Sequence, residues 1–202
     1  MHRRTLTLHL AVVAALIVPA LAVTPAVLSA QTAAVDAENM ALRQSLTGAW
    51  VGVLEYRDYS EPPTSTKRVD LPTWLSISDS GKSMTWKYTY DDGPNKVLEE
   101  TDTVIFDPAS KSYSEAANGK PASSYKVDGY ETLKEGRGTL VLHGTGTDND
   151  KPSETRTTMT IRRNLLEILE EVRPEGSSEA FAFRHLFRFT RAQPPAATAS
   201  RH

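Results

Sequence analysis

Hydrophobic and polar residues alternate in short segments along most of this chain, and turn-forming residues separate the segments. In residues 83–90, the large side chains of Trp86, Tyr88 and Tyr90 alternate with serine, threonine and lysine. A period of two places successive side chains on opposite faces of a β-strand, so this segment predicts a half-buried strand. The run that follows in residues 91–95, Asp-Asp-Gly-Pro-Asn, is typical of a tight turn.

Segments with a similar pattern recur at intervals of roughly a dozen residues. They are residues 50–57, 69–78, 97–106, 123–133, 138–146, 155–163 and 180–190. Pro72, inside the second of them, predicts a sheet edge or a bulge because proline has no N–H to donate to a ladder. With short turns and no long crossover segment, the pattern predicts an all-β fold, an antiparallel up-and-down barrel of about eight to ten strands, with a sandwich as the alternative.

Two segments have helical character. Residues 36–45 predict a short N-terminal helix that leads into the first strand. In residues 164–173, Leu165, Ile168 and Leu169 fit one face of a helix, whereas the turn signals on both sides favour a strand. A meander needs a strand at this position, so we favour the strand.

The N-terminal segment, residues 1–30, differs from the rest of the chain. It begins with two arginines, continues in an uninterrupted apolar run over residues 10–18 and ends in small residues. This order is typical of a secretory signal peptide, with cleavage expected after Ala22 or Ala30. An uncleaved membrane anchor is the alternative, although the apolar run is short for a bilayer. The pattern therefore predicts a periplasmic or secreted protein.

The chain of 202 residues has room for one ordinary domain. We assign residues 31–45 to a linker with the short helix, residues 46–191 to the barrel and residues 192–202 to a disordered tail. A formal net charge of −2 gives no reason to expect nucleic acid or anionic lipid as a partner. The absence of cysteine excludes thiol nucleophiles, zinc–thiolate sites and disulfides.

Both ends of the barrel segment resemble lipocalin-like (calycin) barrels. Gly48-Ala49-Trp50 is similar to the G-x-W start of their first strand, and residues 187–191, Phe-Arg-Phe-Thr-Arg, are similar to their terminal strand. The resemblance implies that Arg188 or Arg191 packs across Trp50 and closes one end, because a guanidinium stacks well on an indole. It also implies a closed barrel whose interior holds a small hydrophobic molecule.

Aromatic residues of the predicted strands are the candidate ligand-binding residues. The predicted set is Trp50, Leu54, Tyr56, Trp86, Tyr88, Tyr90 and His185. Large aromatic side chains supply much of the contact area in small-molecule pockets. The same residues are equally typical of a barrel core that side chains fill completely, and the pattern leaves both interpretations open.

Two histidines, His143 and His185, lie within the barrel segment. His185 belongs to an alternating row with the four phenylalanines of residues 181–189. Some lipocalin-like barrels bind haem through one histidine, so the resemblance implies haem as a possible cofactor; a hydrogen-bonded core histidine is the favoured interpretation. His143 has no neighbour at a metal-ligand spacing, and no metal site is predicted.

Acidic residues occur in adjacent pairs, at 91–92, 99–100 and 170–171. Adjacent residues of a strand face opposite ways, so the pairs predict solvated faces or turns rather than a catalytic pair of carboxylates. Residues 148–150, Asp-Asn-Asp, predict a hairpin turn because the glycine and distal glutamate of a calcium loop are missing.

The sequence thus favours an exported, non-enzymatic barrel that binds a small hydrophobic molecule in its interior. The alternatives are an interaction module with a packed core, a haem-binding barrel that uses His185, and a weak enzyme at the barrel mouth with His185 or His143 as base. No stable membrane anchor is expected after signal cleavage, and the oligomeric state is left open.

Overall fold

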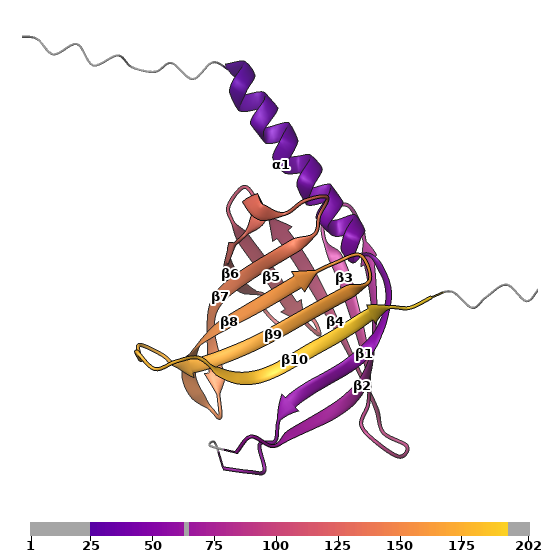
Figure 1. Cartoon of the computed structure of the whole chain (residues 1–202), viewed down its shortest axis with the longest axis vertical. Helices are drawn as coiled ribbons and strands as arrows, with labels where there is room; N and C mark the ends of the chain where they lie inside the picture. The colour runs from indigo at the N-terminus through magenta and orange to yellow at the C-terminus, as the bar shows by residue number, and fades with distance from the viewer. Residues whose placement is uncertain (1–24, 63–64, 194–202) are drawn as a thin grey trace, which may run out of the picture.

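A closed antiparallel barrel of ten strands makes up the body of the protein (Figure 1). The computed structural model describes residues 25–62 and 65–193. The elements in chain order are α1 (Pro25–Leu46), β1 (Gly48–Arg57), β2 (Arg68–Asp79), β3 (Met84–Asp91), β4 (Val97–Asp107), β5 (Ser112–Ala117), β6 (Ser123–Asp128), the 3₁₀ turn η1 (Tyr130–Thr132), β7 (Gly138–Asp148), β8 (Lys151–Ile161), β9 (Leu165–Pro174) and β10 (Ala182–Arg191).

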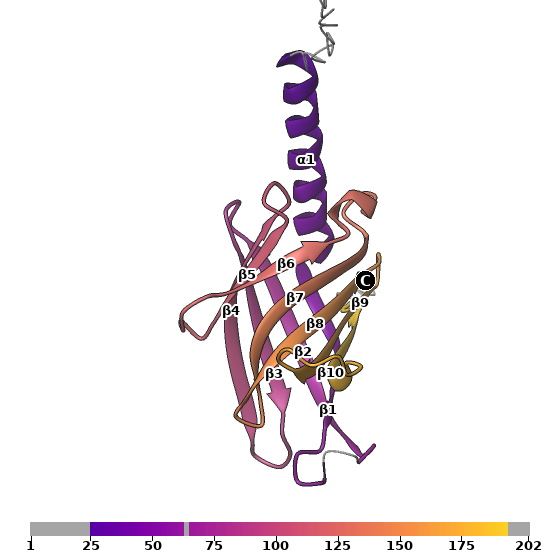
Figure 2. The same cartoon turned by 90° about the vertical axis from the view of Figure 1, so that its left-hand side faces the viewer.

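The strands form an up-and-down meander (Figures 1 and 2). Each strand pairs with its neighbours along the chain, and β1 also pairs with β10. Closure provides partners for the N–H and C=O groups that an open sheet would leave unpaired at its edges. The all-β prediction and the predicted barrel are confirmed.

Two strands, β9 and β5, have sequences in which the strand pattern is weak. Residues 164–173 fall almost entirely in β9, so the favoured strand is confirmed over the helix. The strand β5 was not predicted, because its residues Ser-Tyr-Ser-Glu-Ala-Ala include no β-branched side chain. β5 pairs with β4 on one side and with β6 on the other, and this pairing holds a segment with weak strand propensity in the sheet.

The N-terminal helix is longer than the predicted residues 36–45, since α1 has 22 residues. Its segment contains no glycine and has proline only at Pro25, the first helical position, where the missing N–H costs nothing. Most of the predicted signal peptide lies outside the described residues, whereas Ala30 falls within α1. Most of the predicted tail, from residue 194 on, also lies outside them.

Within the described ranges, no helix combines the length and the apolar character that crossing a membrane requires. The β7–β8 turn has the predicted hairpin form, because Asn149 and Asp150 both adopt positive φ angles, of 49° and 60°. Pro72 is also placed as predicted: the ladder between β2 and β3 ends at Thr73, so at Pro72 the strand pairs only with β1.

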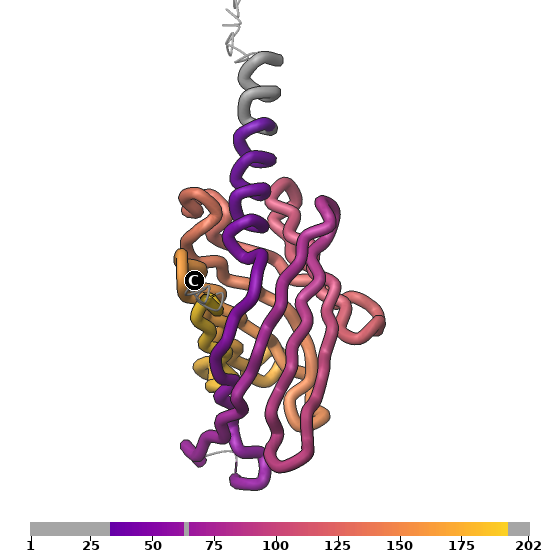
Figure 3. The backbone as a smooth tube through the Cα atoms, turned by 90° about the vertical axis from the view of Figure 1, so that its right-hand side faces the viewer, coloured from indigo at the N-terminus to yellow at the C-terminus, as the bar shows by residue number. Residues whose placement is uncertain are grey.

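The last turns of α1 cover one end of the barrel (Figure 3). Leu42 and Leu46 are completely buried in the core there, and the Trp50 indole Nε1 donates a hydrogen bond to the Leu46 carbonyl at 2.8 Å. The Arg191 guanidinium donates to the carbonyls of Ser45 and Thr47. The C-terminal carbonyls of a helix have no partner within the helix, so these bonds fix α1 to the barrel.

Candidate functional site

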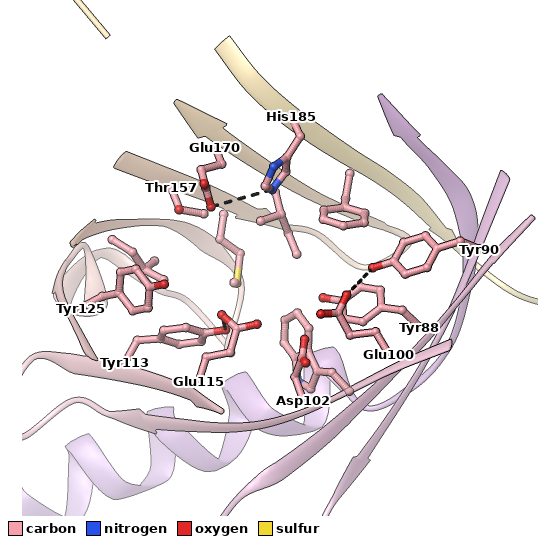
Figure 4. A pocket seen from close by; sticks show the side chains of 15 residues that line it. Tyr88, Tyr90, Glu100, Asp102, Tyr113, Glu115, Tyr125, Thr157, Glu170 and His185 are labelled. Atoms are coloured by element: carbon pink, nitrogen blue, oxygen red, sulfur yellow. Dashed lines mark hydrogen bonds and ion pairs between the residues drawn. The ribbon is translucent and has the colours of Figure 1, made fainter. Parts of the chain in front are cut away.

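The barrel interior is not filled, and it contains a cavity of about 210 Å³ (Figure 4). The cavity lies towards the end of the barrel opposite α1. Its lining residues are Trp86, Tyr88, Tyr90, Glu100, Asp102, Tyr113, Glu115, Tyr125, Leu142, Thr157, Met159, Ile168, Glu170, His185 and Phe187. All eight strands from β3 to β10 contribute side chains that converge on one space, which favours the ligand-cavity interpretation over the packed core.

The structure separates the predicted ligand-binding residues into three places. Trp86, Tyr88, Tyr90 and His185 line the cavity. Leu54 and Tyr56 line a neighbouring hollow of about 440 Å³, which also includes Tyr90 and His185. Trp50 lies at the α1 end, beneath the Arg191 guanidinium. We name the hollow lined by Leu54 and Tyr56 the vestibule, because its shared residues connect it with the cavity.

Four carboxyl groups line the cavity, and the sequence did not reveal them as a set. They belong to Glu100, Asp102, Glu115 and Glu170. The prediction that the acidic pairs 99–100 and 170–171 are wholly solvated is therefore wrong. Alternation along a strand turns one member of each pair outward and the other into the barrel.

The carboxyls of Asp102 and Glu115 form a buried pair on the neighbouring strands β4 and β5. Burial, together with the nearby negative charge of Glu115 and a hydrogen bond with it, raises the pKa of Asp102 to about 8. Burial also raises the pKa of Glu115. The two groups therefore hold a proton between them at neutral pH, since ionising both in the same apolar space is unfavourable. Tyr113 donates a further hydrogen bond to Glu115 at 3.2 Å.

The other two carboxyls have different partners. Tyr90 donates a hydrogen bond to Glu100 at 3.0 Å. Glu170 accepts a hydrogen bond from Arg184 at 3.0 Å, and its other oxygen lies 3.8 Å from Nε2 of His185. Burial lowers the pKa of His185, and the charge of Glu170 opposes this shift. Arg184 thus compensates Glu170, and His185 is mainly neutral at pH 7.

A β-bulge in β10 explains why Arg184 and His185 both reach Glu170. Phe183 pairs with Glu171 of β9 and His185 pairs with Glu170, so Arg184 is an extra residue without a partner in the ladder. The extra residue shifts the alternation by one position. The predicted single row of residues 181–189 is therefore wrong: Phe183 pairs on the outer face, whereas His185 turns into the cavity.

The phenylalanines before the bulge have outer partners. The Arg68 guanidinium lies 4.3 Å from the Phe183 ring centroid. Phe181 is covered on its faces by Arg156 and Arg173, at 4.4 and 4.5 Å. These contacts stabilise the outside of the barrel and supply nothing to the cavity.

Aromatic rings make up most of the remaining cavity wall. Tyr88 and Tyr90 stack with 5.9 Å between their centroids, and Phe187 lies 5.4 Å from Tyr88. On the other side, the Tyr125 ring lies so close to Gly144 that a Cβ atom there would be 2.4 Å from it. A glycine in β7 therefore makes room for one of the cavity tyrosines.

The surroundings of His143 and His185 bear on the alternatives of a histidine base, a metal site and bound haem. His143 lies outside the cavity, where its Nε2 is 3.2 Å from Asp128. In the part of the chain that the structure describes, no group of three or more histidine, aspartate or glutamate residues is arranged to hold a metal ion. A cavity of about 210 Å³ is also small for a porphyrin, so the space beside His185 fits haem poorly.

Among solved structures, the S-type phycobiliprotein lyase CPES from Guillardia theta superposes on this barrel with a TM-score of 0.50. The likeness covers 75% of this chain and 91% of that chain, at 11% sequence identity. This chain has a lipocalin-like fold. At this identity the likeness concerns the fold alone. The sequence matches no protein-family profile and no curated protein.

The lipocalin-like fold gives the cavity its position inside the barrel, and this chain's own residues give it its chemistry. The sequence signal that would have found the carboxyls is the face of each strand. Glu100 and Asp102 share a face with the buried Val104 and Phe106 of β4. Acidic residues that continue a buried row point inward.

Proposed function

We propose that this protein is a binding protein that holds one small molecule inside its barrel. The cavity of about 210 Å³ carries the proposal, because an unfilled barrel interior with convergent polar groups is the usual form of a small-molecule site. The volume lies below the ~300–1,000 Å³ of clefts that hold drug-sized ligands, so the ligand is small.

The vestibule supports a route between the cavity and solvent. It shares Tyr90, Glu100, His185 and Phe187 with the cavity and extends to Leu54, Tyr56 and Leu71. A ligand that enters there passes apolar side chains together with Arg184 and Glu100 before it reaches Asp102 and Glu115, which line only the cavity. The sequence-based expectation of a hydrophobic ligand fits the aromatic wall, where an apolar body would lie.

Native mass spectrometry of the protein, purified from its host without detergent, tests this function. We expect the folded protein to carry, or to take up from a cell extract, one small molecule that leaves on denaturation. Substitution of a cavity residue, Tyr88→Ala, should abolish the added mass, and the exterior substitution Thr85→Ala serves as control. A bare polypeptide mass under all conditions would contradict the proposal.

Export is a separate part of the proposal. The basic start and apolar run of residues 1–30 support a cleaved signal peptide. N-terminal sequencing of the protein recovered from the periplasm or the medium is expected to begin after Ala22 or Ala30. Recovery of the intact N-terminus in the cytoplasm would contradict export and would leave the binding proposal standing.

A further inference from the structure

The cavity is lined by four carboxyl groups, and the negative charge of most of them is not balanced by a neighbouring lysine or arginine. Its lining contains no lysine and no arginine. Arg184, from the vestibule, bonds to Glu170 alone among the four carboxyls. In the described ranges no lysine or arginine forms an ion pair with Glu100, Asp102 or Glu115, whose hydrogen bonds come from tyrosines and from each other.

Asp102 is buried and has an unpaired side-chain oxygen, so it is the carboxyl with which a ligand would most readily form a hydrogen bond. The residue is only 3% exposed, yet the Oδ1 atom of its side chain has no hydrogen-bond partner within the protein. Nε1 of Trp86, which faces Asp102 across the β3–β4 ladder, also lacks one. Buried polar atoms are nearly always paired in folded proteins, because an unpaired one has lost its hydrogen bonds to water without replacement. Figure 4 shows the Asp102 carboxyl pointing into the cavity.

The aromatic wall supplies the second half of a recognition site. Trp86, Tyr88 and Tyr113 line the cavity beside the Asp102–Glu115 pair. The faces of such rings carry partial negative charge and attract cations, most strongly where water is excluded. Carboxyls and ring faces in one small enclosed space select for a positively charged group and against an anion.

We propose that the ligand is a small organic cation, a quaternary or protonated amine, whose charged group lies between the Asp102–Glu115 pair and the aromatic wall. This inference rests on the proposed binding function and gives the chemistry of its ligand. A bare metal ion fits less well, since it needs several oxygen ligands around one point. The described carboxyls are not arranged in that way.

Binding of such a cation is linked to the proton that Asp102 and Glu115 share. The other ionisable groups that face this pair are the carboxyls of Glu100 on β4 itself and Glu170 on β9, and the mainly neutral imidazole of His185 on β10. The tyrosines that face the pair are Tyr88 and Tyr90 on β3, Tyr113 on β5 and Tyr125 on β6. A cation favours the ionised carboxyls and expels the proton, so its affinity rises as the pH increases from about 6 to about 9.

Calorimetric titration of the full protein with choline tests the inference. Choline keeps its charge at every pH, and 3,3-dimethylbutan-1-ol is its neutral counterpart of the same shape. We expect choline to bind at least about tenfold more tightly than the alcohol, with affinity that increases with pH. Tetramethylammonium and butylamine extend the test to a smaller quaternary amine and a primary amine.

Matched variants locate the interaction. Asp102→Asn and Glu115→Gln keep the side-chain shape and remove the charge, and each should weaken choline binding by about tenfold or more. Glu99→Gln removes a carboxyl from the outer face of β4, where the side chain is 61% exposed, and should leave binding unchanged. Circular dichroism of each variant separates loss of binding from loss of fold.

Two results would overturn the inference in distinguishable ways. Equal or tighter binding of the neutral alcohol, or a neutral or acidic molecule in the native mass spectrum, would disprove a cationic ligand and leave the binding function intact. Failure of all three cations at millimolar concentration, together with a bare polypeptide mass, would remove both the inference and the proposed function.

Discussion

The guanidinium of Arg191 stacks on the indole of Trp50, with its central carbon 4.2 Å from the ring centroid. The two residues pair across the β1–β10 ladder that closes the barrel. Gly48 belongs to the same arrangement, because its φ of 127° suits glycine and a Cβ atom there would lie 2.8 Å from Nη1 of Arg191. Arg188, the other arginine that the resemblance offered, lies on the outer face and bonds to Glu167.

Replacing Arg191 should therefore destabilise the protein far more than replacing Arg188. Arg191→Ala removes the stacking contact and leaves the carbonyls at the end of α1 without their donors, a loss of roughly 2–4 kcal/mol in the free energy of unfolding. Arg188→Ala removes one exposed ion pair, worth about 0–1 kcal/mol. Urea unfolding of both variants checks the difference, and equal losses would contradict the assigned role.

The contact between Tyr125 and Gly144 predicts a steric effect on the cavity. Gly144→Ala places a methyl group where the Tyr125 ring now lies, so the ring must move, at a cost of about 1–3 kcal/mol. Gly146→Ala, two residues along the same face, is the matched control because its nearest atom lies at 3.8 Å. Thermal unfolding and ligand titration should change for the first variant and stay near wild type for the second.

The Asp102–Glu115 pair predicts how stability depends on pH. The pKa of Asp102 is raised from 3.8 to about 8 in the folded protein. The stabilisation that comes from its protonated form is complete below pH 4 and is lost as the pH rises to 8, because the unfolded chain ionises first. Glu115, whose pKa is also raised, adds to this loss, and the negative charges of Glu100 and Glu170 act in the same direction.

Asp102→Asn should remove the part of that pH dependence that comes from Asp102. The amide stays neutral and can donate to Glu115, so we expect the variant to be more stable than wild type at pH 8 and similar at pH 4. Urea unfolding at a series of pH values checks this against Glu99→Gln, which should follow wild type throughout. A variant that is less stable at pH 8 would argue against a protonated pair.

An ion pair near the vestibule end predicts a coupling between distant strands. Arg57 at the end of β1 bonds to both oxygens of Asp148 at the end of β7, at 2.8 and 3.1 Å. Both side chains are largely buried, so removing either should cost roughly 1–3 kcal/mol. A double-mutant cycle with Arg57→Ala and Asp148→Ala measures the coupling, and strictly additive losses would show that the pair contributes nothing.

Periodicity was enough to predict the barrel, because alternation along a strand is a local property that each segment carries by itself. Most strands, the hairpin at residues 148–151 and the position of Pro72 follow from such local signals. β5 did not follow, since only its neighbours hold it in the sheet. Local sequence patterns therefore predict most strands of this barrel, but not β5, which depends on its pairing with β4 and β6.

The cavity chemistry was less accessible to the sequence, for two physical reasons. Which face of a strand turns inward depends on closure, so spacing alone did not separate Glu100 and Glu170 from their outward-facing neighbours Glu99 and Glu171. The bulge at Arg184 then changes the face near the start of β10 without any glycine or proline to mark it. Of the predicted set, the four residues that line the cavity belong to β3 and β10.

The pairing of β1 with β10 also determines when the molecule can fold. Trp50 lies near the start of β1 and its partner Arg191 is the last residue of β10, so the loop that must close between them spans nearly the whole domain. A contact of this separation forms late and slowly, because chain entropy opposes it until the intervening hairpins exist. The β1–β10 ladder therefore cannot form until β10 has left the ribosome. The hydrogen bonds between Arg191 and the end of α1 form no earlier, because Arg191 is the last residue of β10.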